Sequence, residues 1–272
     1  MFEPGHDQAS GLRRLFKPRA LRLLPVAVDP QPSVSAAFAL NLAAALVRSG
    51  WNPIVLDAHR QGVGSLFGLD SGYELDDLMA GRCSFSQAMR RSPEGVAVLM
   101  ARRGLGSIAA DPRTAEAVFS ALASLSGAFD VALLHAPAAT LGALLCEQEA
   151  ETALLCGPDD RDLTDTYARL KSMVNDHHLS RFRVVFDGTH SPADAASRHR
   201  RLAAAAARFL DVSVLFGGSM GKGADRDAAV RDRRSVFSVA ADGPAARAFE
   251  RIASAAHDWR MPAFTPDLRT IH

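Results

Sequence analysis

Short apolar runs alternate with helical patterns along most of this chain, and the first of them organise the rest. Leu23–Val28 is apolar, the stretch from Ser33 to Ser49 has the spacing of a helix, and a second apolar run, Ile54–Leu56, ends on Asp57. This order of strand, loop, helix and strand predicts a βαβ unit at the start of a parallel sheet. In such a unit the loop after the first strand faces the ligand crevice.

The same alternation continues into the C-terminal part of the chain. Because strands buried on both faces read as short apolar runs, we expect one α/β domain: a doubly wound, mostly parallel sheet of about seven to eight strands flanked by helices. The further predicted strands are Val96–Met100, Phe129–Leu134, Thr152–Cys156, Phe182–Phe186, Val212–Phe216 and Val236–Val239. The further predicted helices are Glu74–Met79, Phe85–Arg91, Asp111–Ser126, Asp162–Val174, Pro192–Leu210 and one from Gly243 to about Trp259. We assign residues 23–260 to this domain, 1–22 to an N-terminal helical extension and 261–272 to a tail.

The N-terminal extension is basic and carries a narrow apolar stripe. Asp7 is placed to cap a short helix, which Gly11 weakens and Pro18 ends. The stripe consists of Ala9, Leu12, Leu15 and Phe16, and the basic residues are Arg13, Arg14, Lys17, Arg19 and Arg22. Two interpretations fit: a solvated arm, favoured on spacing alone, or a docking helix that folds on a partner.

Composition limits the class of protein. The chain has 272 residues, of which 48% are hydrophobic, and a net charge of +1. A core of good size is therefore expected, whereas bulk attraction to nucleic acid or membrane is not. Three cysteines without a C-x-x-C motif favour a reduced, cytoplasmic protein. We expect no transmembrane helix and no signal peptide, because the chain has no long uncharged apolar run.

The loop after the first predicted strand cannot form a phosphate cradle. Such a cradle needs glycines for close backbone approach, a lysine for the β- and γ-phosphates and a hydroxyl group for Mg²⁺. Here the loop runs DPQPSVSA from Asp29 to Ala36, and Pro30 and Pro32 remove two N–H donors. Asp29 adds a negative charge, and a unit charge at about 4 Å is worth roughly 4 kcal/mol at an effective dielectric constant of about 20. We expect no tight triphosphate binding at this loop.

Several segments resemble the MinD/ParA branch of P-loop ATPases, and within it the flagellar number regulators called FlhG, FleN, MotR or YlxH. The similar segments are Asn41–Ala58, Leu66–Met89, Asp162–Met173 and Arg208–Met220. The most specific match is DQASGLR, Asp7–Arg13, which fits the family's DQAxxLR element in full. The resemblance covers most of the chain and implies a MinD-like P-loop NTPase fold.

The N-terminal match implies a protein partner. In the family this element binds FlhF, a GTPase of the SRP type, and stimulates its GTP hydrolysis. The implied contacts are Asp7, Gln8, Ala9, Leu12 and Arg13. Gln8 would act in trans at the GTP site of FlhF, where an amide can orient a water molecule and an arginine can stabilise developing phosphate charge. With the resemblance added, the docking interpretation is favoured.

The resemblance does not extend to the phosphate-binding residues. Counting back from Asn41, Pro30 stands at the family's signature lysine. Ser35 stands at the P-loop lysine, and Ala36 at the Mg²⁺-binding hydroxyl residue. Three groups that hold the triphosphate and its metal are therefore missing.

The acidic residues of the family site are also mostly replaced. The family's two strand-end aspartates match Asp57 and His59, and its metal-associated aspartate after the fourth strand matches His135. Phe186 and Asp187 lie where the family has its base-contacting asparagine. Together these losses predict a pseudo-ATPase, with neither ATP nor Mg²⁺ expected as a cofactor and no intrinsic catalytic residue.

The last predicted helix carries an apolar stripe that could pack either on lipid or on the protein core. Ala245, Phe249, Ile252, Ala256 and Trp259 share one helical face, and the polar face mixes arginines with acids. Such a stripe packs on a protein core more often than on lipid. Although the family has a membrane-binding helix here, we do not expect membrane association, and we expect ATP-driven dimerisation to be absent or independent of nucleotide.

Other candidate sites are weaker. His59 and His135, with Cys156 as a distant third, could bind Zn²⁺. Two histidines without a firm third ligand are more simply explained as chance replacements in a site that has lost its function, so we assign no metal. Gly217–Gly221 before Lys222 suggests a flexible loop rather than a phosphate loop, and Ser191–Arg201 a solvated helix face.

The leading hypothesis is a regulator of flagellar number or placement that acts through FlhF. It would act in the cytoplasm, or at the flagellar pole, which it would reach through its partners. Basal-body proteins are further partner candidates. The alternatives are an active MinD/ParA-type ATPase with an unorthodox site and a scaffold that binds a flagellar transcription regulator. Oligomeric state stays open.

Overall fold

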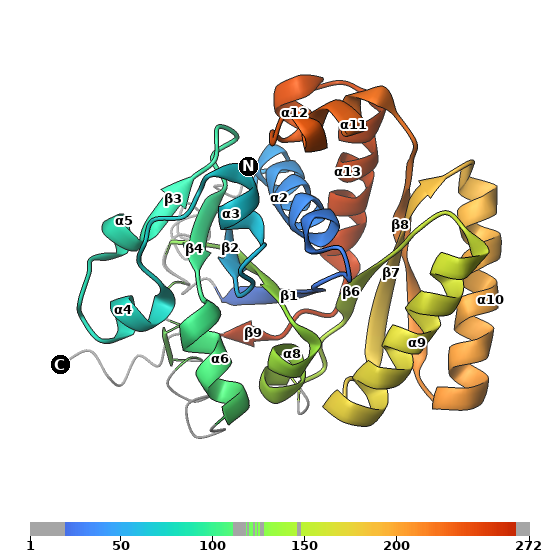
Figure 1. Cartoon of the computed structure of the whole chain (residues 1–272), viewed down its shortest axis with the longest axis horizontal. Coiled ribbons are helices and arrows are strands. Elements are labelled where there is room, and N and C mark those ends of the chain that lie inside the picture. The colour runs from blue at the N-terminus through green and yellow to red at the C-terminus, as the bar shows by residue number, and fades with distance from the viewer. Residues whose placement is uncertain are drawn as a thin grey trace, which may run out of the picture.

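The computed structural model describes residues 20–110, 118, 120, 121, 123, 125, 128–145 and 148–264. A mostly parallel sheet crosses the middle of the molecule, with helices on both faces (Figure 1). The strands are β1 (Leu21–Ala27), β2 (Pro53–Asp57), β3 (Met89–Arg91), β4 (Ala97–Met100), β5 (Val131–Ala136), β6 (Thr152–Cys156), β7 (Arg181–Thr189), β8 (Ser213–Gly221) and β9 (Ala263–Phe264). Their order is β3-β4-β2-β5-β1-β6-β7-β8, and β9 pairs with β1. The predicted doubly wound α/β fold is confirmed.

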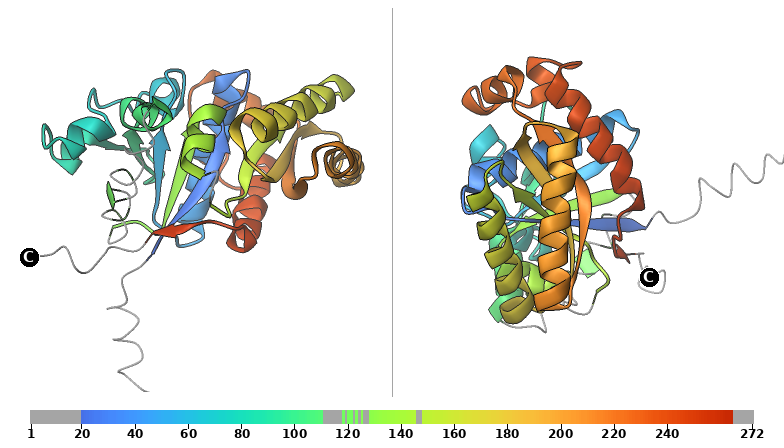
Figure 2. Two further views of the ribbon diagram at one scale, coloured as in Figure 1. Left: turned by 90° about the horizontal axis from the view of Figure 1, so that it is seen from below. Right: turned by 90° about the vertical axis from the view of Figure 1, so that its right-hand side faces the viewer.

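The helices form two layers over the sheet (Figure 2). They are α2 (Pro32–Arg48), α3 (Val63–Phe67), α4 (Leu75–Met79), α5 (Phe85–Ala88), α6 (Arg102–Ala110), α8 (Ala138–Leu145), α9 (Asp160–His177), α10 (Pro192–Leu210), α11 (Ala224–Arg231), α12 (Val236–Val239), α13 (Pro244–Ala255) and the 3₁₀ helix η2 (Ala256–Asp258). One apolar core joins the sheet to α8, α9 and α10, and the other joins it to α2 and α13. Successive strand residues point to opposite faces of the sheet, so Leu23 belongs to the first core and Leu24 to the second.

Helix α2 lies in the second core and is covered on nearly every side. Pro32 begins it, where its missing N–H costs nothing, and Gly50 follows its end with a φ of 84° that favours glycine. Its residues 35–46 are all buried. The ring of Phe38 lies 5.9 Å from that of Phe249 on α13. The C-terminal stripe is therefore a core-packing face, as the sequence indicated.

The register of the central strands positions the site. β5 lies between β1 and β2, and its residue His135 is paired with Val26 on one side and Asp57 on the other. All three strands are parallel, so the loops that follow them meet at one edge of the sheet.

Several predicted elements differ from the observed ones. The loop His59–Gly72 contains α3, and the helix predicted at Phe85–Arg91 ends at Ala88, after which β3 forms an antiparallel edge strand. Helices α6 and α8 were not predicted. Val236–Val239 is a helix rather than a strand, because the Ser235 hydroxyl caps it by accepting from the Phe237 N–H.

Two predictions about the C-terminal half were wrong. Gly217–Gly221 belongs to β8 and is not a loop. A Cβ on Gly218 would lie 2.6 Å from Cγ1 of Ile252, so this glycine lets α13 pack closely. Arg198 in the predicted solvated face is 6% exposed and donates to the carbonyl oxygens of Gly157 and Asp159.

Some predictions fall outside the described residues: nearly all of the N-terminal extension, most of the helix Asp111–Ser126, and the tail after Phe264. In the part of the chain that is described, no helix is long and apolar enough to cross a bilayer.

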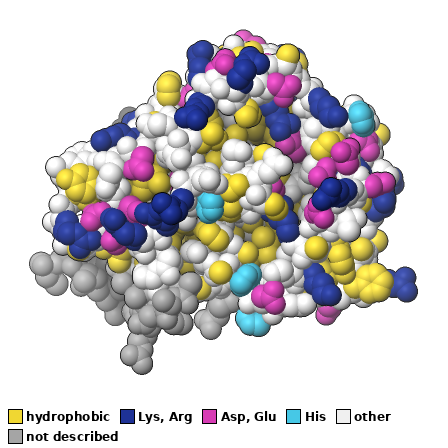
Figure 3. Space-filling view, viewed as in Figure 1, with side chains coloured by type: hydrophobic (Ala, Val, Ile, Leu, Met, Phe, Trp, Pro, Cys, Tyr) yellow, Lys and Arg dark blue, Asp and Glu magenta, His cyan; other side chains and the backbone are white. Residues whose placement is uncertain are grey.

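On the face in Figure 3, Lys and Arg side chains are interspersed with Asp and Glu, so no extended patch of one sign covers it.

Candidate functional site

Three fully buried side chains meet at the carboxyl ends of the central strands. Ser35 Oγ, in the first turns of α2, lies 2.9 Å from Nε2 of His135 at the end of β5. His135 Nδ1 lies 3.0 Å from Oδ1 of Asp57, the last residue of β2. Each of the three residues is 0% exposed. We call this the Ser35–His135–Asp57 network.

Backbone groups complete the network at the β1–α2 loop. The Asp29 N–H donates to Ser35 Oγ at 3.0 Å, and this hydroxyl lies 3.2 Å from the Pro32 carbonyl oxygen, to which it can donate. The loop is thus folded onto the side chain that stands where the resemblance requires a lysine. Pro30 is exposed, and Ala36 is 0% exposed and offers no hydroxyl group.

Asp57 also holds the start of α3. Its Oδ2 accepts from the Gly64 N–H at 2.8 Å, and its Oδ1 accepts a long bond of 3.4 Å from the His59 N–H. A Cβ on Gly62 would lie only 2.0 Å from Asp57 Oδ1, so only glycine fits there. Because both carboxylate oxygens are engaged inside the protein, Asp57 offers no open position to a metal ion.

The order Ser–His–Asp resembles a hydrolase triad, but the geometry excludes nucleophilic catalysis. A catalytic serine must reach the substrate and needs an oxyanion site beside it. Ser35 is fully buried, and its hydroxyl is already bonded to the Asp29 N–H. The network is therefore a structural connection between α2, β5 and β2.

His59 lies next to the network without joining it through its ring. Its ring Nδ1 accepts from the Gln61 N–H at 3.2 Å. Burial, followed by the nearby His135 imidazole, lowers the pKa of His59 below its ordinary value, while Asp57 opposes the change.

The zinc interpretation gains no support. Within the described ranges no group of three or more His, Cys, Asp or Glu side chains is arranged to hold a metal ion. Cys156 is buried on β6, and this burial raises the pKa of its thiol.

An ion pair closes the other side of the β1–α2 loop. Arg169 on α9 places Nη1 2.8 Å from Asp29 Oδ2, and both side chains are less than a fifth exposed. The guanidinium also donates to the carbonyl oxygens of Leu155 at 3.2 Å and Val28 at 3.3 Å. Sequence reasoning identified the Asp29 charge but missed its partner, which lies 140 residues away.

The cleft beside this ion pair is acidic. It has a volume of about 310 Å³ and is lined by Asp29, Asp162, Asp165 and Asp187 together with Arg169. Arg169 pairs with Asp29 and Arg226 pairs with Asp187, so Asp162 and Asp165 leave the cleft with a net negative charge, which repels a polyphosphate rather than attracting it.

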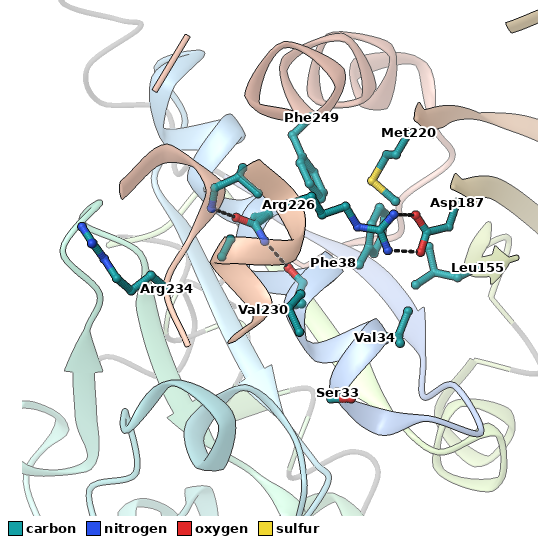
Figure 4. Close-up of a pocket in the computed structure, with 14 residues that line it drawn as sticks. Ser33, Val34, Phe38, Leu155, Asp187, Met220, Arg226, Val230, Arg234 and Phe249 are labelled. Carbon is teal, nitrogen blue, oxygen red and sulfur yellow. Dashed lines mark hydrogen bonds and ion pairs between the residues drawn. The ribbon is translucent and has the colours of Figure 1, made fainter. Parts of the chain in front are cut away.

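A second ion pair includes the residue that the family resemblance matches to the region of a base-contacting asparagine. Asp187, near the end of β7, is 7% exposed and pairs with Arg226 of α11 (Figure 4). Burial raises the pKa of Asp187, while Arg226 opposes the rise. The adjoining cavity, lined in part by Phe38 and Phe249, measures about 50 Å³. This volume suits a few water molecules and is too small for a purine.

The predicted site residues therefore divide into two groups. The structure brings Asp29, Ser35, Asp57 and His135 together, with His59 beside them. The predicted partner contacts Asp7, Gln8, Ala9, Leu12 and Arg13 lie outside the described residues. Arg169 and Arg226 were missed, because a lone arginine on a helix gives no sequence signal of its partner.

Comparison with known proteins agrees with this architecture. No family model matches the chain. The curated protein Antiactivator FleN of Pseudomonas aeruginosa is 28% identical over 229 residues, which is 82% of this chain and 82% of that protein. The cell division protein MinD of Aquifex aeolicus has a TM-score of 0.62 at 14% identity, covering 88% of this chain and 98% of its own. The septum site-determining protein MinD of Pyrococcus horikoshii, complexed with Mg-ADP, has a TM-score of 0.61 at 17% identity and covers 88% and 96%.

Proposed function

We propose that this chain, which is similar to FleN and has a MinD-like fold, belongs to the FlhG/FleN group of the MinD/ParA branch and regulates flagellar biogenesis by binding other proteins. The observation that carries this proposal is the Ser35–His135–Asp57 network, which stands where a nucleotide-dependent relative needs phosphate- and metal-binding groups. The body then serves as a scaffold, and the N-terminal segment acts on a partner.

The residues present do not fit Mg²⁺ and a triphosphate, although the similar MinD of Pyrococcus horikoshii is complexed with Mg-ADP. A triphosphate at the β1–α2 loop would need free N–H groups, yet Pro30 and Pro32 have none and the Asp29 N–H is bonded to Ser35. A metal ion would need a hydroxyl at Ala36 and an open oxygen on Asp57, and neither exists. We therefore derive no step through nucleotide.

The proposed activity resides in Asp7–Arg13 and acts on FlhF. Gln8 orients the attacking water in the GTP site of the partner, and Arg13 stabilises the charge that develops on the transferred phosphate. Asp7, Ala9 and Leu12 provide the docking contacts. This part of the proposal rests on the complete match to the DQAxxLR element.

GTP turnover by FlhF from the same organism tests this role. The full chain and a peptide of residues 1–22 should both accelerate hydrolysis, and Gln8→Ala should abolish the acceleration in each. Gln61→Ala, a change of the same kind at an exposed position of the body, is the matched control and should accelerate like the wild type. Equal acceleration by Gln8→Ala and wild type would remove Gln8 from the mechanism.

A second candidate function follows from the similarity to a protein named an antiactivator. In it, the α/β body binds a flagellar transcription regulator and restrains it. A pull-down with residues 1–22 deleted separates the two candidate functions. The shortened chain should still bind the transcription regulator, whereas it should no longer bind FlhF. Under either function the protein acts in the cytoplasm, or at the flagellar pole through its partners.

A further inference from the structure

Two adjoining hollows lie at the amino-end edge of the sheet, opposite the site described above. They measure about 460 and 790 Å³, and both are lined by Arg22 and His257. Here β9 pairs with the first residues of β1 (Figure 2). We call the two hollows together the amino-edge groove. Trp51 lines one hollow and Trp259 the other, and they are the only two tryptophans of the sequence.

The first hollow has an aromatic lining held in place. The guanidinium of Arg22 lies 5.2 Å from the centre of the Trp51 ring. The Trp51 indole N–H donates to His257 Nε2 at 3.1 Å, and the two rings meet edge to face at 4.9 Å. Trp51 remains only half-buried, so part of a large apolar surface is left available.

The second hollow contains an unsatisfied donor. Trp259 is 5% exposed, and its indole N–H has no hydrogen-bond partner among the described residues. A buried donor without an acceptor is unfavourable, because it has lost its hydrogen bonds to water without replacing them. Met261 and Pro262 line the same hollow and add apolar surface. Glu149 and Arg260 also line this hollow. The site therefore suits a segment that carries apolar and charged side chains together and also brings a carbonyl oxygen.

The chain supplies such a segment at this place. Ala20 itself lines the first hollow, and the sequence before it is LFKPR, with Leu15 and Phe16 five and four positions away. At no more than about 3.6 Å per residue, the Cα of Phe16 stays within roughly 14 Å of that of Ala20, and the Cα of Leu15 within roughly 18 Å. A tether this short gives an effective concentration in the millimolar range or above.

We propose that the amino-edge groove receives Leu15 and Phe16 of the chain's own N-terminal segment, with a main-chain carbonyl of that segment accepting the Trp259 N–H. The apolar side chains cover Trp51, Met261 and Pro262. The occupant is intramolecular because the tether begins inside the groove.

The consequence of docking rests on the proposed function of the same segment. Leu12, a proposed contact with FlhF, precedes Leu15 and Phe16 by three and four positions and belongs to the same apolar stripe that the sequence predicts. A segment seated in the groove cannot bind FlhF. Docking therefore lowers the fraction of molecules whose activating element is available to FlhF.

Tryptophan fluorescence tests the docking without FlhF. In the full chain, Leu15→Asp with Phe16→Asp should raise the acrylamide quenching constant roughly twofold and shift emission to the red, because the half-buried Trp51 indole loses its cover and becomes more exposed to solvent. Phe2→Asp, an apolar-to-acid change of the same segment far from Ala20, is the matched control and should leave both unchanged. The wild-type signal should also stay constant on dilution.

Three results would overturn the proposal. No change in the double variant means that the groove is not covered by these side chains. A change with Leu268→Asp and Ile271→Asp instead assigns the groove to the C-terminal tail. A quenching constant that rises on dilution assigns it to the segment of a second copy. The quenching assay involves no partner, so failure of GTPase activation would leave its result intact.

Discussion

Replacing His135 with leucine tests whether the Ser35–His135–Asp57 network holds the three loops together. Leucine has a similar volume and keeps the site filled, but it offers neither nitrogen. The Asp57 carboxylate, 0% exposed, loses its 3.0 Å contact and keeps its bond from the Gly64 N–H. Ser35 loses its 2.9 Å partner and keeps the Asp29 N–H.

The expected cost follows from these two contacts. A hydrogen bond between neutral groups contributes about 1 kcal/mol, and one to a charged group about 1.5–3 kcal/mol. The retained backbone donors prevent a larger penalty, so His135→Leu should lower the free energy of unfolding by roughly 2–4 kcal/mol. With a urea m-value near 3 kcal/mol/M, the midpoint falls by about 1 M.

Urea denaturation followed by circular dichroism measures this change. His190→Leu is the matched control, because His190 is exposed, and it should cost less than about 0.5 kcal/mol. Ser35→Ala combined with His135→Leu should cost about 1 kcal/mol less than the sum of the single changes, since the two share one contact. A cost for His135→Leu no larger than that of His190→Leu would refute the reasoning.

Three other changes probe the surroundings of the network. Gly62→Ala should destabilise the fold by roughly 2 kcal/mol or more in urea denaturation, because its Cβ would lie 2.0 Å from Asp57 Oδ1; an unchanged midpoint would contradict this geometry. Arg226→Met leaves the buried Asp187 carboxylate unpaired and should cost roughly 3 kcal/mol at neutral pH. The penalty should shrink as acid protonates Asp187, whose pKa burial already raises, and a pH-independent cost would argue against an uncompensated charge. The lowered pKa of His59 means that the unfolded chain binds more protons once pH falls below about 6.5, so His59 lowers stability from there down through its folded-state pKa. His59→Gln should therefore lose less stability than the wild type between about pH 7 and pH 5. Equal losses in thermal unfolding would contradict a lowered pKa of His59.

The sequence predicted the elements whose pattern is set by burial alone. The five residues of β6 and the whole of α10 have the predicted bounds, because one is a short run buried on both faces and the other an amphipathic helix with a proline start. Val236–Val239 was predicted wrongly, since an apolar run of four residues fits a short helix as well as a strand.

The contacts of the site could not be read from the sequence. Ser35 and His135 lie 100 residues apart, and only the register of β5 between β1 and β2 brings them within 2.9 Å. The family resemblance predicts that the nucleotide-binding residues are replaced, and this stays a prediction. That the replacing side chains bond to one another, and that Arg169 and Arg226 neutralise the neighbouring carboxylates, depends on tertiary packing.

Titration of the full chain with ATP and Mg²⁺ in an isothermal calorimeter tests the central claim most directly. If the network and the Asp29–Arg169 ion pair occupy the nucleotide site, no binding heat should appear up to about 1 mM ATP, which means a binding free energy weaker than about −4 kcal/mol. The unfolding temperature should likewise not rise with ATP. Binding with a micromolar Kd would contradict the account, because the loop from Asp29 to Ala36 would then open to a triphosphate.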